Sequence, residues 1–367
     1  MKISCTQENL YKGLSIVFSA VGTRANLPVL SNILLSTDKG QLKLSATDLE
    51  IGINFWVGGK IEKEGKITVP ARLMLDFVSQ NSDKIINLEA KGTTLNLVSE
   101  HHLATLNGIE ASEFPLIPEI KKTPLTQVPA SAFKEGAMAV VFAAAVDESR
   151  PVLTGVLLRF AKDQVKIVAT DSYRLAQGQV ALDKKLTESA EVVVPAKTMN
   201  QLIRLVSPQE EKISIHLGEN QIQFTSGNAL LTSRLIEGAF PAYEQIIPTK
   251  FETTIEINRS EFASALKMAS VFARSSANNV KIKTEKENLT ISAVSPQMGS
   301  EVSTLSIKSE GAPTQTAFNS KFILDALGCL ASEKIVLQFS GKLSPALLKS
   351  AKNPNYFYLL MPLQTEE

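Results

Sequence analysis

Three stretches of the sequence read almost alike: "ITVPARLMLDFV" at 67–78, "VVVPAKTMNQLI" at 192–203 and "TAFNSKFILDAL" at 316–327. Their basic residues Arg72, Lys197 and Lys321 lie 125 and 124 residues apart. A period of this length is that of a domain, because short structural repeats recur every roughly 20 to 50 residues. The chain of 367 residues is therefore predicted to form three similar domains, at 1–122, 123–248 and 249–367.

Each copy begins with a predicted helix that has one apolar face. In the first copy, Leu10, Leu14 and Val17 recur at helical spacing, and the same stripe returns from Phe133 and from Phe262. Thr6, Ser131 and Asn258 precede these stripes and are predicted to cap the three helices.

A second helix is predicted in each copy of the repeated phrase, roughly 60 residues after the first. Met74, Met199 and Ile323 start its apolar face, while Pro70 and Pro195 suit a first helical turn. Between the helices run alternating segments such as 41–57, 164–180 and 212–226. Period-two alternation indicates antiparallel strands with one buried face, so the fold class is α+β, with two helices packed on antiparallel sheets in each domain.

Composition excludes several classes of protein. Hydrophobic residues make up 44% of the chain and the formal net charge is +1, so folded cores are expected and bulk charge predicts no strong attraction to DNA. Two cysteines cannot build a disulfide framework. The N-terminus lacks an apolar secretion segment, and the longest apolar run, 136–146, is too short to cross a bilayer. We expect a cytoplasmic protein with no membrane partner.

Candidate catalytic residues are few. His101 and His102 are expected to face opposite sides of a strand, so no metal site and no other cofactor is predicted. The segment "SGKLS" at 340–344 lacks the first glycine of a phosphate-binding loop. Asp48 and Asp171 recur in the tripeptide "ATD" and fit a turn-capping role better than a catalytic pair. The sequence predicts no catalytic residue.

The repeated basic residues have two interpretations. Arg72, Lys197 and Lys321 each stand two positions before a core-facing residue, which turns them about 200° away from the core. Any one of them fits an ordinary solvated helix face. Three at one repeat position favour a shared positive surface, although Asp76 and Asp325 lie on similar faces.

The order of several motifs resembles the bacterial DNA polymerase III beta subunit family, the sliding clamps. The motifs are "LPVLSNILL", "ATDLE", "TVPAR", "RPVLTGVLL", "ATDSYRLA", "VPAK", "FPAYEQIIP", "AFNSKFILDAL" and "YFYLLMPL", and they span essentially the whole chain. The resemblance implies three DNA-clamp domains per chain and a head-to-tail homodimer, a ring of six domains around duplex DNA. It also implies no catalytic activity and sequence-independent DNA contact.

The resemblance further implies partners and their binding residues. The partners are the replicative DNA polymerase alpha subunit, the clamp-loader complex, and other polymerases and repair proteins with clamp-binding motifs of the Gln-x-x-Leu-Phe kind. The residues implied to face DNA are Arg24, Arg72, Arg150, Lys197, Lys12 and Lys321. Those implied at the dimer interface are Val271, Phe272, His101 and Leu103. Those implied in the peptide pocket are Leu153, Thr170, Ser172, Tyr173, Arg174, Leu175, Pro241, Ile246, Asn319, Phe322, Leu343, Leu359, Met361, Pro362 and Leu363.

The size of the domains indicates how many chains a ring needs. A domain of about 120 residues has a diameter of roughly 35 Å. Three such spheres in contact leave a hole of only about 5 Å, whereas six leave one of about 35 Å, wide enough for a duplex. Two other functions remain open: a repeat-built peptide-binding scaffold that never encloses DNA, and an enzyme whose site forms only between domains.

Overall fold

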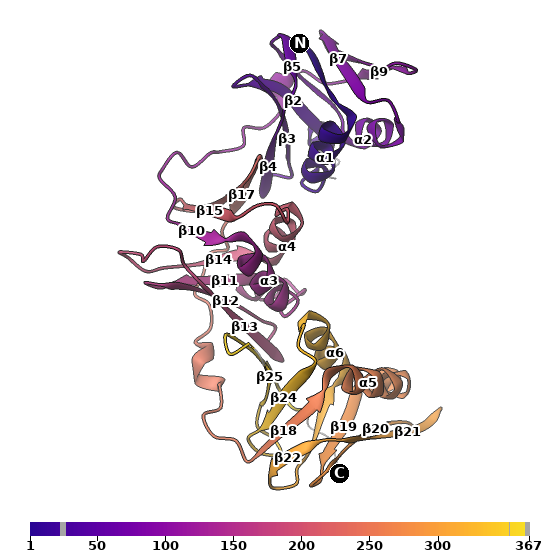
Figure 1. The fold of residues 1–367 in the computed structure, drawn as a ribbon, viewed down its shortest axis with the longest axis vertical. Helices are drawn as coiled ribbons and strands as arrows, with labels where there is room; N and C mark the ends of the chain where they lie inside the picture. Colours follow the sequence, from indigo (N-terminus) through magenta and orange to yellow (C-terminus); the bar gives the residue numbers. More distant parts are fainter. Residues whose placement is uncertain (23–26, 352, 364–367) are drawn as a thin grey trace. The chain divides into compact units, whose positions relative to one another are not determined.

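A computed structural model describes residues 1–22, 27–351 and 353–363 of the chain (Figure 1). Its contacts divide the chain into two compact units. The N-terminal unit contains Met1–Ser131, Leu182–Lys184 and Lys197–Leu235, and the C-terminal unit contains Ala132–Ala181, Lys185–Ala196 and Ile236–Glu367. The middle repeat of the sequence therefore contributes to both units.

Two antiparallel sheets form the N-terminal unit. The larger has eight strands in this order: β10 (Thr126–Pro129), β15 (Lys212–Leu217), β16 (Gln221–Ser226), β17 (Ala229–Arg234), β4 (Ile51–Val57), β3 (Gln41–Thr47), β2 (Asn32–Asp38) and β6 (Lys66–Pro70). The smaller has five: β5 (Lys60–Lys63), β1 (Lys2–Thr6), β7 (Ile85–Lys91), β8 (Thr94–Val98) and β9 (Leu103–Asn107). The larger sheet joins strands of the first and middle repeats.

The C-terminal unit also has two antiparallel sheets. The larger has nine strands in this order: β14 (Ala190–Pro195), β11 (Gly155–Phe160), β12 (Gln164–Thr170), β13 (Arg174–Ala181), β26 (Tyr356–Leu360), β25 (Ala346–Ser350), β24 (Lys334–Phe339), β18 (Thr253–Asn258) and β22 (Lys308–Gly311). The smaller has four: β21 (Gly299–Ser306), β20 (Asn288–Ser295), β19 (Asn279–Thr284) and β23 (Gln315–Asn319). The alternating segments of the sequence are confirmed as the pairs β3/β4, β12/β13 and β15/β16.

The helices lie where the apolar stripes predicted them. They are α1 (Gln7–Phe18), α2 (Ala71–Gln80), α3 (Ala130–Val141), α4 (Ala196–Leu205), α5 (Arg259–Ala273) and α6 (Ser320–Cys329). The stripe residues Leu10, Phe133 and Phe262 and the second-helix residues Met74 and Met199 are all completely buried. Helix α1 packs against α2, and α5 packs against α6.

The predicted helix starts are partly confirmed. The Thr6 hydroxyl accepts a hydrogen bond from the Asn9 amide, and Oδ1 of Asn258 accepts from the amides of Ser260 and Glu261. The prediction for Ser131 is wrong, because α3 already begins at Ala130.

The two prolines also stand one position earlier than expected. Pro70 and Pro195 end strands β6 and β14, and each helix begins at the next residue. In these strands the prolines pair with Asn32 and Gly155. Each proline is therefore the last paired residue of its strand and directly precedes a helix. Among the residues that the structure describes, no helix is long and apolar enough to cross a membrane.

The two large sheets share one plan. Reading the N-terminal sheet from β10 to β6 and the C-terminal sheet from β18 to β14 gives eight corresponding strands in the same order. Thus β17 lies beside β4 as β26 lies beside β13. Strand β22 is an addition at the end of the C-terminal sheet.

Candidate functional site

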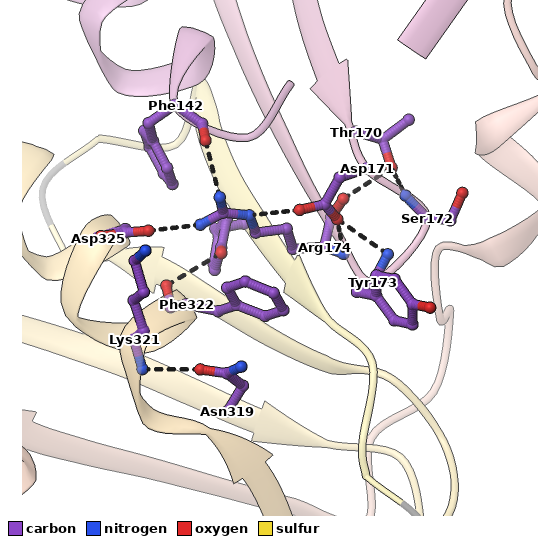
Figure 2. A network of polar contacts seen from close by, with 11 residues as sticks. Phe142, Thr170, Asp171, Ser172, Tyr173, Arg174, Asn319, Lys321, Phe322 and Asp325 are labelled. Carbon is purple, nitrogen blue, oxygen red and sulfur yellow. Dashed lines mark hydrogen bonds and ion pairs between the residues drawn. The ribbon is translucent and has the colours of Figure 1, made fainter. Parts of the chain in front are cut away.

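The turn between β12 and β13 is held by its own side chains (Figure 2). Oδ1 of Asp171 accepts hydrogen bonds from the amides of Tyr173 and Arg174, both at 3.0 Å. The Thr170 hydroxyl donates to the carbonyl of Arg174 at 2.7 Å and accepts from the amide of Ser172. Ser172 has a positive φ of 77°, which the turn imposes. The turn-capping interpretation of Asp171 is confirmed.

Arg174 is the centre of a polar network that joins three elements. Its Nε donates to Oδ2 of Asp171 at 2.9 Å, its Nη1 to Oδ2 of Asp325 at 2.7 Å, and its Nη2 to the carbonyl of Phe142 at 2.9 Å (Figure 2). The residue is only 9% exposed, and a buried charge requires such partners. The network fixes the start of β13 to α6 and to the segment after α3.

Two aromatic rings complete the surroundings of Arg174. The guanidinium carbon lies 4.3 Å from the ring centroid of Phe322 and 5.5 Å from that of Phe142. Burial raises the pKa of Tyr358, so its hydroxyl stays protonated and donates to the carbonyl of Phe322 at 3.0 Å. Phe322 is therefore held at its ring by Arg174 and at its backbone carbonyl by Tyr358, and its ring forms a wall of the site.

Most of the predicted pocket residues meet around this network. Leu175 pairs with Leu359 across β13 and β26, and both are completely buried. The Met361 amide donates to the carbonyl of Tyr173 at 2.9 Å, and the Leu363 amide donates to that of Ala317 at 2.8 Å. These bonds bring residues 361–363 beside the Asp171 turn and beside β23, the strand that ends at Asn319.

The predicted pocket residues divide into a floor and a rim. Leu153, Thr170, Leu175 and Leu359 are buried, and Phe240 and Tyr243 extend the same apolar cluster. The exposed members are Ser172, Tyr173, Pro241, Ile246 and Leu343. Leu343 and Leu363 also line one hollow of about 180 Å³ with Ala317. An apolar floor with a few fixed polar groups suits binding of a small apolar side chain.

Four of the residues predicted to face DNA lie exposed on helices, and a fifth, Arg150, lies in a loop. Lys12 lies on α1, Arg72 on α2, Lys197 on α4 and Lys321 on α6, all exposed. Arg150 lies in the loop before the 3₁₀ helix Pro151–Thr154, and its Nη1 donates to the Ser172 hydroxyl at 3.3 Å. Arg24 lies outside the described residues.

Two of these basic residues already have acidic partners. Nε of Arg72 donates to Oδ2 of Asp76 at 2.9 Å on the same helix. Nζ of Lys197 donates to Oδ2 of Asp48. Burial alone would raise the pKa of Asp48, but hydrogen bonds from Lys197 and two backbone amides lower it below its ordinary value. Sequence reasoning missed the second pair, because these residues are 149 positions apart.

The residues predicted at the dimer interface lie on exposed surfaces of both units. Leu103 begins β9, the last strand of its sheet, and is 74% exposed. Val271 and Phe272 lie on α5, which packs over β20 and β21. Val271 is exposed and Phe272 is half-buried.

His101 does not lie on a strand, contrary to expectation. It occupies the turn between β8 and β9, where its amide and its Nδ1 bond the two carboxylate oxygens of Asp83 at 2.9 and 2.7 Å. The His101 hydrogen bond is the main cause that lowers the pKa of Asp83. Glu100 lies close enough that the three side chains resemble a metal-binding group. Nδ1 of His101 is already used in the hydrogen bond to Asp83, and exposed acidic groups commonly hold no metal, so the group carries no metal assignment.

Comparisons with known proteins agree along the whole chain. The family models of the DNA polymerase III beta subunit match at 1–118 (N-terminal domain), 127–242 (central domain) and 244–364 (C-terminal domain). The beta sliding clamp of Synechococcus elongatus is 33% identical over 373 residues, which cover 99% of each chain.

Solved structures agree as well. The DNA polymerase sliding clamp of Bacillus subtilis has a TM-score of 0.94 at 29% identity and covers 100% of both chains. The DNA polymerase III subunit beta of Pseudomonas aeruginosa has a TM-score of 0.93 at 28% identity and covers 99% of this chain and all of that one. The chain therefore belongs to the DNA polymerase III beta subunit family, and it is a DNA sliding clamp of three clamp domains, without catalytic activity of its own.

Proposed function

We propose that this clamp works as a head-to-tail homodimer that encloses duplex DNA and tethers partner proteins through the pocket around Arg174. The observation that carries the proposal is a pair of open sheet edges. Strand β9 ends the five-stranded sheet of the N-terminal unit, and β21 ends the four-stranded sheet of the C-terminal unit. An open edge presents unpaired backbone groups, so natural proteins cover it or use it for pairing.

Both edges have apolar side chains that suit burial. Leu103 on β9 is 74% exposed, and Val302 on β21 is 64% exposed. Val271 and Phe272 lie on α5, the helix that packs against β21. Because the two edges are different surfaces of one chain, an interface between them is heterologous and generates a ring when its rotation closes. Two chains then supply the six domains that an opening wide enough for a duplex requires.

The exposed basic residues fit weak contacts with phosphate. Arg72 and Lys197 are paired with Asp76 and Asp48, so a DNA phosphate must compete with a carboxylate. The Arg72–Asp76 pair is exposed on both sides, and such pairs contribute only about 0 to 1 kcal/mol, so a phosphate can displace Asp76. In the other pair Asp48 is largely buried, and Lys197 is the exposed partner. Weak, sequence-independent contacts suit a ring that holds DNA by enclosure and slides along it. Lys12, Arg150 and Lys321, together with Arg24, are proposed to add to this surface.

The pocket around Arg174 is proposed to bind the clamp-binding motifs of partners. Those partners are the replicative polymerase alpha subunit, the clamp loader, and other polymerases and repair proteins. A motif of the Gln-x-x-Leu-Phe kind would place its apolar pair against the floor of Leu175 and Leu359, beside the fixed ring of Phe322. Buried apolar anchors of this kind provide much of the binding energy of peptide motifs. A role in replication places the protein in the cytoplasm.

Retention on DNA of different topology tests enclosure. After loading onto nicked circular DNA by a bacterial clamp loader with ATP, the protein should stay bound through a high-salt wash and leave once the circle is cut. Release at equal rates from circles and linear molecules would contradict enclosure and favour a peptide-binding scaffold.

The solution mass tests the proposed interface. The native protein should have a mass of about 80 kDa, twice the 39.8 kDa of one chain. Leu103→Asp should reduce it to that of one chain, because a carboxylate would be buried without a partner. Val146→Asp is the matched control, since Val146 is 95% exposed and lies on neither edge. A dimer that survives Leu103→Asp would remove β9 from the interface.

A further inference from the structure

The turn before β4 repeats the turn before β13 bond for bond. Oδ1 of Asp48 accepts from the amides of Glu50 and Ile51 at 3.0 and 2.8 Å. The Thr47 hydroxyl donates to the carbonyl of Ile51 and accepts from the amide of Leu49. Leu49 has a φ of 79°, close to the 77° of Ser172. The N-terminal unit therefore has its own copy of the turn that supports the peptide pocket of the C-terminal unit.

The neighbouring strand is in the same register in both units. Ser233 of β17 pairs with Ile51, just as Leu360 of β26 pairs with Arg174. The Arg234 amide donates to the carbonyl of Glu50 at 3.0 Å, which corresponds to the bond between Met361 and Tyr173. Arg234 thus occupies the position that corresponds to Met361 in the C-terminal pocket.

A second hollow lies at this equivalent place, and we call it the Arg234 pocket. It has a volume of about 230 Å³. Its lining includes Leu49, Ile51, Pro115, Leu116, Pro118 and Arg234, all within the N-terminal unit. Leu116 is 92% exposed and lies between Pro115 and Pro118.

The segment that forms the outer wall is anchored rather than loose. A methyl group on Gly52 would lie 2.5 Å from Cγ2 of Ile117, so the side chain of Ile117 rests directly on the backbone of β4. Gly52 corresponds in register to Leu175, the floor of the C-terminal pocket. The Arg234 pocket is thus a preformed hollow with one wall held in place by Ile117.

The exposed guanidinium of Arg234 shows what this pocket can recognise. Within the described part of the chain, the Arg234 side chain has neither an ion pair nor a hydrogen bond, and the residue is exposed. The Thr232 side chain also lines the pocket, and its buried hydroxyl has no hydrogen-bond partner among the described residues. Glu50 is the only acidic group among the lining residues. Apolar walls and, among the described residues, one unpaired cation match an apolar side chain next to a carboxylate.

We propose that the Arg234 pocket is a second docking site for a linear segment of a partner protein, in which a leucine or phenylalanine adjoins an acidic residue. The apolar side chain lies against Leu49 and Leu116, and the carboxylate binds the guanidinium of Arg234. This inference rests on the proposed function, because the C-terminal pocket is the peptide site that it copies. The Arg234 pocket has Ile51 where the C-terminal pocket has Arg174, so it lacks the polar network that fixes the C-terminal pocket and binds more weakly.

Peptide titration of the full-length chain tests the proposal. The probe is the pentapeptide Gln-Ala-Asp-Leu-Phe, followed by calorimetry. The native chain should bind two peptides, the second about tenfold more weakly than the first. Arg234→Glu should abolish binding at the weaker site and leave the tighter site unchanged. The control is Arg204→Glu, which makes the same charge change at an exposed residue that does not line the pocket. It should leave both sites unchanged.

The two proposals fail in different ways. Binding of one peptide per chain, or a weaker site that survives Arg234→Glu, overturns the second site and leaves the first intact. A tighter site that survives Arg174→Ala overturns the assignment of the C-terminal pocket instead. If Arg174→Ala lowers the melting temperature, Met361→Ala replaces it in that comparison.

Methyl resonances give the location independently. On addition of the peptide to the Arg174→Ala or Met361→Ala chain, the methyl signals of Leu49 and Leu116 should shift and those of Leu343 should not. Shifts at neither Leu49 nor Leu116 would contradict the proposal, even if a second peptide binds elsewhere.

Discussion

The carboxylate of Asp325 lies 2.7 Å from Nη1 of Arg174, although 151 positions separate the two residues in the chain. The bond ties the second helix of the last repeat to the first residue of β13. Arg174 is 9% exposed and also bonds Asp171 and the carbonyl of Phe142, so three of its N–H groups have acceptors only when this group of residues is complete. This network therefore holds the start of β13, at the pocket floor, and helix α6 in a fixed position relative to each other.

Replacement of Asp325 by alanine should destabilise the C-terminal unit. The change leaves a buried guanidinium with one carboxylate fewer, which costs about 1 to 3 kcal/mol of unfolding free energy. Urea unfolding of both proteins measures the difference. Asp76→Ala is the matched control, because it removes a similar ion pair from an exposed helix face and should cost less than about 0.5 kcal/mol. Equal losses in the two variants would mean that burial of Arg174 adds nothing.

The His101–Asp83 pair should make stability depend on pH in the acid range. The pKa of the folded Asp83 carboxyl lies below its ordinary value of 3.8, chiefly because His101 bonds it. A carboxyl with a lowered folded pKa stabilises the protein above the unfolded pKa, and this contribution is lost as the pH falls through the folded pKa. The measurement is the unfolding free energy of the native protein minus that of Asp83→Asn at each pH. This difference should be constant from about pH 5 to 7 and should decrease toward about pH 3.

The same measurement on His101→Ala tests whether the histidine is the cause of the lowered pKa of Asp83. Without the imidazole, the pKa of Asp83 should rise toward its ordinary value, and the loss of stability below about pH 5 should be smaller. An unchanged pH profile in His101→Ala would show that the other hydrogen bonds to Asp83, not the histidine, lower its pKa.

Gly108 should tolerate no side chain. A methyl group there would lie 1.9 Å from the carbonyl oxygen of Thr68, which is backbone and cannot turn aside. Gly108→Ala should therefore cost more than about 2 kcal/mol of unfolding free energy, since the bridge between Thr68 and Ile109 must open. Gly58→Ala, where a methyl group would meet nothing within 4 Å, is the control and should cost little. Similar melting temperatures for the two variants would contradict this account of the close approach.

Local patterns in the sequence predicted the helices, the strand pairs and the turns. The apolar stripes from Leu10 and Phe262 lie on buried helix faces, and Asp48 and Asp171 cap turns as expected. Such features depend on residues within a few positions of each other, so one segment holds enough information to predict them. The error at Ser131 amounts to a shift at a helix end, where the first turn is set by the bond between Ala130 and Glu211.

Long-range pairing could not be predicted in the same way. The contacts of Lys197 with Asp48 and of Arg174 with Asp325 join segments about 150 positions apart. The local sequence of each segment contains no feature that identifies its partner. For Asp325 the sequence allowed only a solvated helix face, yet the structure places it against a guanidinium. The peptide pocket was assigned by resemblance, and its residues stay a prediction until a peptide is bound.

The boundaries between the sequence repeats do not coincide with the boundaries of the two large sheets. Because β17 of the middle repeat is hydrogen-bonded to β4 of the first, and β26 of the last repeat to β13 of the middle one, neither of the two large sheets is built from a single repeat. Excision of one copy would not shorten the clamp by a third; it would cut through continuous hydrogen-bonded ladders. Removal of any one repeat would leave at least one of the two large sheets without strands that its remaining strands pair with.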